Sequence, residues 1–229
     1  MAVYFFIIRH AESEVNADPE SRAIWTGRNT WSELTEPGKL QARDLGRSLR
    51  NVPFDRVFCS PTVRTQQTAR YFWTGLGRCW PHLAVAMELA ELDHGALEGK
   101  PKREGNCGAK RDFWRFVPEG GRESQEAVAV RAGNWLAATA DALQGANAVR
   151  LAVITHENVM KSVLVHMLGF DNEQLYHMPF APCGFFVLMR EQNAWRLARE
   201  VLPSHARHLR LPDPHDNHKS AVTDRDVPS

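Results

Sequence analysis

The residues best suited to chemistry follow three short, mainly apolar runs. Arg9 and His10 come directly after the run 3–8, Arg64 stands shortly after the run 57–59, and His156 follows the run 149–154. Histidine is a nucleophile or proton carrier near neutral pH, and arginine binds phosphate through a fork of N–H donors. Positive side chains are costly to bury together without a counter-charge, so we expect these residues to bind an anion. A phosphoryl group matches them best.

The Arg-His dipeptide is not diagnostic on its own. It recurs as Arg207-His208 in a polar stretch where no function is apparent. Arg9 and His10 could equally be two solvated side chains at the end of a strand. A site is favoured because histidine and arginine also stand at equivalent positions after two other apolar runs.

Each apolar run is too short to cross a membrane and has the length of a buried strand. Helices are expected at 35–51, from about Thr62, at 123–143 and at 159–169. Alternating strands and helices form parallel sheets that bind ligands at the carboxyl ends of the strands. The runs 184–189 and 195–201 are expected to form a hairpin at the sheet edge. The sequence therefore predicts an α/β fold, a three-layer α/β/α sandwich with a mostly parallel central sheet and an antiparallel edge strand.

Residues 1–203 are expected to form a single α/β domain with two long substrate-loop insertions, 16–33 and 100–122. The second insertion carries seven lysines and arginines against three acidic residues. From 204 to 229 the chain is polar and rich in proline, which is typical of a flexible tail. Because no apolar core surrounds them, we expect no metal site at the tail histidines His205, His208, His215 and His218.

The composition excludes several classes of protein. The chain has 229 residues, 43% of them hydrophobic, and a formal net charge of +1, so no overall charge points to nucleic acid or an anionic membrane. The four cysteines lack metal-binding spacing and are expected to be reduced thiols. No secretory signal and no run of 18 apolar residues is present. We expect a cytoplasmic protein with a small phosphorylated substrate, no nucleic-acid or membrane partner, and an open oligomeric state that includes a homodimer.

The segment Ile8-Arg9-His10-Ala11-Glu12-Ser13, followed by Asn16, resembles the signature of the histidine phosphatase superfamily. This family includes the cofactor-dependent phosphoglycerate mutases. Further motifs are similar to those of the family and occur in the same order: Leu34-Thr35 with Gly38, Ser60-Pro61 with Arg64, Glu91 with Gly95, Glu123-Ser124, and Thr155-His156. Each motif is weak alone, but together they are specific, and the resemblance covers roughly residues 3 to 190.

The resemblance implies a histidine that accepts a phosphoryl group as phosphohistidine, and this role falls on His10. Arg9, Arg64 and His156 would form the rest of the phosphate pocket, and Asn16 would add a neutral hydrogen bond. We expect one ring nitrogen of His10 to donate its N–H to a backbone carbonyl, which fixes the tautomer and leaves the other nitrogen unprotonated. We expect His156 to be protonated. No metal or cofactor is implied.

One carboxyl group can protonate the leaving alkoxide and later accept a proton from the attacking water. Glu91 matches the acid of the family. Glu88 is the alternative, three residues earlier, but its place before Leu89 resembles the structural lead-in of the family. Glu91 is therefore the preferred general acid and base.

Phosphatase and mutase activities are both compatible with these motifs. Trp25-Thr26-Gly27, Lys102 and Asn158 resemble substrate positions of the mutases, but the segment 98–121 is short for a mutase and only Arg115 stands where mutases have paired arginines. A short cover leaves phosphohistidine open to water, so we favour phosphomonoester hydrolysis over mutase-type transfer. A non-catalytic binder of phosphorylated ligands is the least favoured alternative. The candidate substrate-binding residues are Asn16, Thr26, Gly27, Lys102, Arg115 and Asn158.

Glu157 is the largest departure from the family pattern, because glycine usually follows the second histidine. A carboxylate about 8 Å from a bound phosphate would cost about 2 kcal/mol at an effective dielectric near 20. We therefore expect Glu157 either to turn away from the pocket toward a basic residue or to hold a cation or hydroxyl of the substrate. Ala11 also replaces a usual glycine, and we expect this smaller change to be tolerated.

Overall fold

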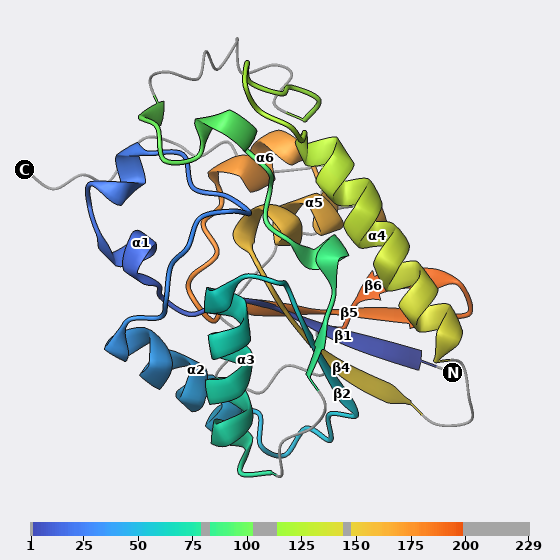
Figure 1. The fold of residues 1–229 in the computed structure, drawn as a ribbon. Coiled ribbons are helices and arrows are strands. Elements are labelled where there is room, and N and C mark those ends of the chain that lie inside the picture. Colours follow the sequence, from blue (N-terminus) through green and yellow to red (C-terminus); the bar gives the residue numbers. More distant parts are fainter. Residues whose placement is uncertain (1, 79–82, 103–113, 144–147, 199–229) are drawn as a thin grey trace, which may run out of the picture.

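The computed structural model describes residues 2–78, 83–102, 114–143 and 148–198 (Figure 1). The strands are β1 (Ala2–Arg9), β2 (Arg56–Cys59), β3 (Leu83–Val85), β4 (Val149–Thr155), β5 (Phe185–Glu191) and β6 (Ala194–Leu197). The α-helices are α1 (Glu14–Ala17), α2 (Glu36–Ser48), α3 (Val63–Leu76), α4 (Gln125–Ala142), α5 (Glu157–Leu168) and α6 (Asn172–His177). The expected domain boundary at 203, the tail 204–229 and the middle of the 100–122 insertion lie outside the described residues.

The strands form one sheet in the order β3-β2-β4-β1-β5-β6. β4 pairs in parallel with β1 and β2, and β3 pairs in parallel with β2. β5 is antiparallel to β1, and β6 is antiparallel to β5, so the expected hairpin lies at the sheet edge. The mostly parallel sheet is confirmed. β3 was not predicted, because three residues are too few to show a periodic pattern.

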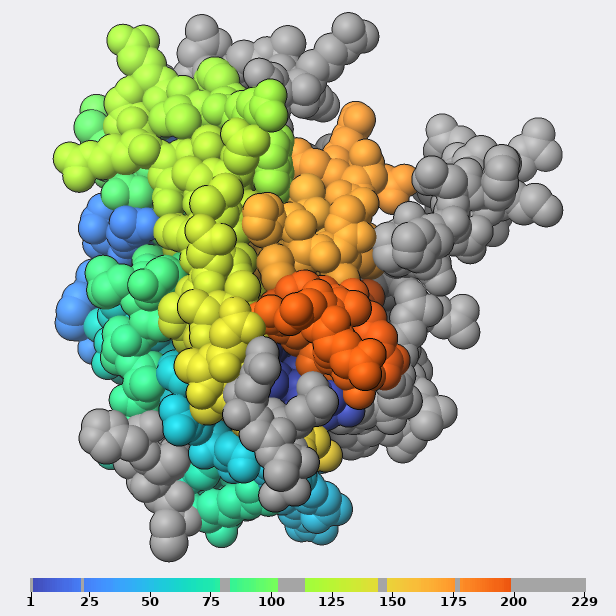
Figure 2. Space-filling model, turned by 90° about the vertical axis from the view of Figure 1, so that its right-hand side faces the viewer, coloured from blue at the N-terminus to red at the C-terminus, as the bar shows by residue number. Residues whose placement is uncertain are grey.

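Alternation along β1 explains why helices cover both faces of the sheet. Successive side chains of a strand point to opposite faces. Phe5 and Ile7 belong to an apolar core with α4 and α5, whereas Phe6 and Ile8 belong to a core with α3. Figure 1 shows α2 and α3 on one side of the sheet and α4 and α5 on the other, and Figure 2 shows α4 in yellow-green beside α5 and α6 in orange. The predicted three-layer sandwich is confirmed.

Helices α2 and α3 approach closely through two glycines. A Cβ atom on Gly46 would lie 2.0 Å from the Phe72 carbonyl oxygen, and one on Gly75 would lie 2.0 Å from the Arg43 carbonyl oxygen. Real Cβ atoms do not come so close to backbone, so both positions require glycine. The contact holds α3 against α2, and α3 carries Arg64 in its first turn, as predicted.

The helix ends follow local sequence signals. The Thr35 hydroxyl accepts the Gly38 N–H over 3.0 Å and caps α2, as the sequence indicated. Ser124 caps α4 in the same way, so this helix begins two residues later than predicted. α5 ends at Leu168, and Gly169, which follows it, has a left-handed φ of 70° that favours glycine.

Within the described ranges, no helix is both long and apolar enough to span a bilayer. The same residues contain no group of three or more histidine, cysteine, aspartate or glutamate side chains that could hold a metal ion. Cys59 and Cys183 are free thiols, while the tail histidines lie outside the described chain.

Candidate active site

The carboxyl ends of β1, β2 and β4 lie side by side. Arg9 of β1 is level with Thr155 of β4, and the His10 N–H donates to the Thr155 carbonyl over 2.9 Å. On the other side of β4, the backbone N–H of Ser60 donates to the carbonyl oxygen of Ile154 over 3.0 Å. Because β4 lies between β1 and β2, His156 is placed between His10 and Ser60. The three strand ends therefore converge as the sequence indicated.

A cavity of about 250 Å³ lies at these strand ends. The predicted site residues in its lining are Arg9, His10, Asn16, Thr26, Arg64, Glu91, Lys102 and Asn158. Ser13, Val15 and Thr30, which were not predicted to bind substrate, also line it. So does Glu157, for which holding a cation or hydroxyl of the substrate was one of two expectations. His156 is fully buried beside the cavity, with its ring centroid 5.2 Å from that of His10.

Two predicted substrate residues do not line this cavity. Gly27 is buried, and its carbonyl accepts a hydrogen bond from Arg64 Nη2 over 3.1 Å, so it positions the arginine. Arg115 is exposed, and its Nε lies 3.2 Å from Glu126 Oε1. The resemblance to mutase substrate residues is therefore only partly matched by the geometry.

His10 is held in one orientation by the backbone. Its Nδ1 lies 2.7 Å from the Ala11 carbonyl oxygen, so Nδ1 donates and Nε2 keeps the free electron pair. Burial, followed by the charges of Arg64 and Arg9, holds the pKa of His10 well below its usual value of 6.5. The ring is neutral at neutral pH and presents a nucleophilic nitrogen.

The two arginines are fixed by carbonyl oxygens. Arg64 is 6% exposed, and its Nη1 donates to the Thr30 carbonyl over 2.9 Å. Arg9 Nη1 contacts the Phe180 carbonyl and lies 2.9 Å from Glu157 Oε2. Arg9 Nε is buried and has no hydrogen-bond partner among the described residues. An unpaired buried donor of this kind is unfavourable for the folded protein.

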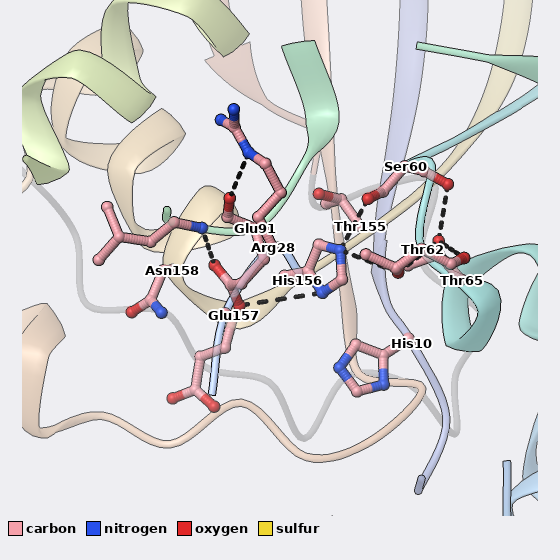
Figure 3. A network of polar contacts seen from close by, with 12 residues as sticks. His10, Arg28, Ser60, Thr62, Thr65, Glu91, Thr155, His156, Glu157 and Asn158 are labelled. Atoms are coloured by element: carbon pink, nitrogen blue, oxygen red, sulfur yellow. Dashed lines mark hydrogen bonds and ion pairs between the residues drawn. The ribbon is translucent and has the colours of Figure 1, made fainter. Parts of the chain in front are cut away.

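The His156 ring lies between the Ser60 hydroxyl and the Glu91 carboxyl group (Figure 3). Its Nε2 lies 2.7 Å from Ser60 Oγ, and its Nδ1 lies 3.8 Å from Glu91 Oε2. Burial, followed by the charge of Arg64, lowers the pKa of His156 well below 6.5. In the protein without a bound anion, the lowered pKa favours a neutral His156, whereas the expected protonated form concerns the ring with a phosphoryl group beside it. A phosphate dianion next to the ring would raise the pKa of His156 again.

Glu91 lines the cavity, and its surroundings favour the protonated carboxyl group. Burial raises the pKa of its carboxyl group, and the N–H of Leu92, 2.8 Å from Oε1, offsets part of that effect. Glu88 is exposed and does not line the cavity. The geometry favours Glu91 over Glu88 as the proton donor.

A network that the sequence did not predict holds the backbone of Glu91. Arg131 on α4 donates to the carbonyls of Glu88, Ala90 and Glu91, the last two over 2.7 and 3.3 Å. Glu123 binds Arg131 with contacts of 2.6 and 3.0 Å. The Glu123-Ser124 motif was a signal for this network, but nothing local in the sequence indicates that Arg131 reaches these carbonyls.

Glu157 does not turn away from the pocket. Its carboxylate lines the cavity and bridges two cations, with Oε2 2.9 Å from Arg9 Nη1 and Oε1 2.8 Å from Lys161 Nζ. The predicted basic partner exists, but it is an arginine of the pocket itself. The expected outward orientation is wrong, because Glu157 begins α5 directly after His156 and its side chain meets Arg9 across the strand ends.

The fold and the pocket define a class of protein: an α/β protein that presents two histidines, two arginines and a buried carboxyl group at the ends of parallel strands. Such a set suits phosphoryl transfer, because it offers a nucleophile, fixed positive charge and a proton donor. Residues 5–202 match the family model of the histidine phosphatase superfamily, branch 1. The chain belongs to this superfamily.

Similar proteins include phosphatases and mutases. An adenosylcobalamin/alpha-ribazole phosphatase of Salmonella typhimurium is 28% identical over 179 residues, which cover 75% of this chain and 83% of the relative. Phosphoserine phosphatase 1 of Hydrogenobacter thermophilus is 26% identical over 201 residues, 83% of this chain and 88% of the relative. The crystal structure of a phosphoglycerate mutase from Bacillus anthracis has the same fold, with a TM-score of 0.72 at 15% identity over 86% of this chain and 91% of that one.

Proposed function

We propose that this protein hydrolyses phosphomonoesters of small metabolites through a phosphohistidine on His10. The orientation of His10 carries the proposal: its Nδ1 is tied to the backbone, its ring is neutral, and Arg9 and Arg64 line the same cavity. The phosphatases among its relatives support hydrolysis as the outcome.

In the first half of the reaction, His10 Nε2 attacks phosphorus while the bond from phosphorus to the ester oxygen breaks. Arg9 and Arg64 bind the phosphoryl oxygens and stabilise their charge in the transition state. Glu91 transfers its proton to the departing alcohol oxygen. The products of this step are the free alcohol, a phosphohistidine and a Glu91 carboxylate.

In the second half, water attacks the phosphohistidine. Glu91, now ionised, accepts a proton from the water, and the bond between nitrogen and phosphorus breaks. Inorganic phosphate leaves, and His10 and Glu91 return to their starting states. One carboxyl group thus serves both halves, as its position beside His156 and the cavity allows.

The decisive experiment compares the wild type with His10→Ala on p-nitrophenyl phosphate and a panel of small phosphorylated metabolites. Loss of the nucleophile is expected to lower kcat/KM by at least about 1,000-fold. His166→Ala is the matched control, because His166 is exposed on α5 and outside the cavity. Rapid quenching of the wild type should trap an acid-labile phosphoryl group on residue 10.

Two results would contradict the proposal. If His10→Ala turns over substrate like the control, the histidine is not the nucleophile. If the wild type binds phosphorylated ligands without turnover and His10→Ala binds equally well, the protein is a binder and not an enzyme.

A mutase-type phosphotransferase remains the second candidate, because Thr26, Lys102 and Asn158 line the cavity at positions that resemble mutase substrate residues. We favour hydrolysis over transfer, because Arg115, at the position where mutases have paired arginines, does not line the cavity and forms an exposed ion pair with Glu126. Isomerisation of a phosphoglycerate that requires added 2,3-bisphosphoglycerate, with slow release of inorganic phosphate, would establish the mutase instead.

We further propose that the reaction needs no metal ion and takes place in the cytoplasm. Arg9 and Arg64 supply the positive charge that a metal would otherwise supply, and Cys59 and Cys183 are free thiols. Hydrolysis is expected to survive EDTA at millimolar concentration. Loss of activity on chelation, restored by one divalent metal, would overturn this part.

A further inference from the structure

Glu157 occupies a special position in the pocket. The groups that would grip a phosphoryl group are deeply buried, with exposed fractions of 5% for His10 and 6% for Arg64. The Glu157 side chain is 25% exposed and also lines the cavity. Its carboxylate is therefore more exposed than the side chains that would bind the phosphoryl group, and the alcohol part of an ester would extend past it toward solvent.

The position of this carboxylate is fixed. Glu157 is the first residue of α5, and its two oxygens are held by Arg9 and Lys161 at 2.9 and 2.8 Å. Both partners come from rigid elements, β1 and α5. A carboxylate fixed in this way acts on a ligand without first losing side-chain entropy.

Phosphate binding changes the charge balance around Glu157. Arg9 would share its charge between the carboxylate and the phosphoryl oxygens, so Glu157 would be less well compensated than before. A second anionic group on the substrate would then meet two negative neighbours, the phosphoryl group and Glu157. A hydroxyl or ammonium group would instead find an acceptor.

Lys102 is a further opposing charge besides Arg9 and Lys161, because it also lines the cavity and could attract a second anion. Its side chain is exposed, so solvent and salt screen its charge more than that of the part-buried Glu157 carboxylate. We expect the fixed carboxylate to have the larger effect on substrate choice.

We propose that Glu157 makes the site selective for phosphomonoesters of neutral or ammonium-bearing alcohols and against esters that carry a second anionic group. This inference rests on the proposed hydrolase activity and adds its substrate class. Discrimination here comes from repulsion as well as attraction.

The test uses three esters of nearly equal size: O-phosphoethanolamine, 2-hydroxyethyl phosphate and 2-phosphoglycolate. The wild type is expected to have a kcat/KM at least about tenfold higher for the ammonium ester than for the carboxylate ester. Glu157→Gln, which keeps the shape and removes the charge, is expected to lower that ratio at least about fivefold. Glu173→Gln, an exposed carboxylate on α6, removes the same charge and should leave the ratio unchanged.

Two outcomes overturn the inference: an unchanged ratio in Glu157→Gln, or a wild type that prefers 2-phosphoglycolate, which would assign selection to Lys102. Failure of this inference can be distinguished from failure of the hydrolase proposal by calorimetry with 3-aminopropylphosphonate and 3-phosphonopropionate. These phosphonates have no ester bond, so their binding does not depend on hydrolysis. If no ester is hydrolysed, including p-nitrophenyl phosphate, the hydrolase proposal fails. The ratio of the two phosphonate Kd values in the wild type and Glu157→Gln then still decides the role of Glu157.

Discussion

His10 and Glu91 have pKa values shifted in opposite directions by the same cause. Burial disfavours the charged form of each group, so it lowers the pKa of the imidazole and raises that of the carboxyl group. The pH range in which His10 is neutral and Glu91 is protonated becomes wider as a result. This is the combination that the first phosphoryl transfer requires.

The pH profile of kcat/KM should show these two groups. Activity is expected to rise as His10 loses its proton, well below pH 6.5, and to fall as Glu91 loses its proton, above pH 4.5. Glu91→Gln should lower kcat/KM at least about 100-fold for an alkyl phosphate and remove the alkaline limb. The loss should be smaller for p-nitrophenyl phosphate, whose leaving group needs less protonation. If the alkaline limb persists in Glu91→Gln with the same ester, a group other than Glu91 causes it.

The proposed catalytic residues could be predicted because their motifs, each weak alone, are specific together. Arg9, His10, Arg64 and Glu91 stand in motifs whose spacing survives in the sequence, and the structure brings them to one cavity. The protonation of His156 could not be predicted, because it depends on burial and on neighbours from other elements. The inward orientation of the carboxylate that follows His156 depends on the same packing.

At the scale of elements, helix α4 holds the backbone of the proposed acid, Glu91, through the side chain of Arg131. Arg131 reaches across to three backbone carbonyls in the segment that ends at Glu91, and Glu123 orients the guanidinium. A lysine cannot reproduce this fork of donors. Arg131 is therefore a positioning residue in our interpretation.

Arg131→Lys is expected to lower kcat/KM about tenfold for an alkyl phosphate and less for p-nitrophenyl phosphate, because a displaced acid matters most for a poor leaving group. Arg47→Lys, an exposed residue on α2, is the control. Equal losses on the two esters, together with a lower Tm, would indicate a general structural role.

The contact between α2 and α3 makes a separate stability prediction. Gly75→Ala places a methyl group against the Arg43 carbonyl and is expected to lower the free energy of unfolding by about 2–3 kcal/mol. Gly77→Ala is the comparison, because its φ of 66° costs about 1 kcal/mol while no atom of a non-adjacent described residue lies within 4 Å of the added methyl. Urea denaturation measures both. Equal losses would show that the helices can move apart.

The four longest α-helices and the long strands could be predicted from periodicity and capping residues, but the short helices α1 and α6 and the order of strands in the sheet could not. β4 lies between β1 and β2, although it follows both in the chain. The close approach at Gly46 and Gly75 was also not predicted, because a glycine inside a helix does not reveal which backbone it faces.

At the scale of the whole molecule, a buried neutral histidine links stability to pH. The unfolded chain protonates His156 near pH 6.5, whereas the folded protein does so only at much lower pH. Between these values the unfolded state binds more protons, so the free energy of unfolding falls as the pH drops below about 6.5. This contribution has a slope of up to about 1.4 kcal/mol per pH unit.

His156→Gln should remove this contribution, so the free energy of unfolding should depend less steeply on pH below 6.5 than in the wild type. Chemical denaturation at several pH values measures the slope independently of any overall change in stability. His166→Gln, which alters an exposed histidine, should keep the wild-type slope. An identical slope in His156→Gln would show that His156 is protonated in the folded protein.

The place of β1 in the sheet also governs when the protein becomes active during its synthesis. β1 is made before β4 and β5, yet it pairs with β4 through Val3 and Val149 and with β5 through Ala2 and Glu191. Contacts of such high sequence separation form late and fold slowly. On an emerging chain, the strand that precedes the proposed nucleophile His10 can complete its pairing only after β5 has left the ribosome. We therefore expect incomplete chains to have no phosphatase activity.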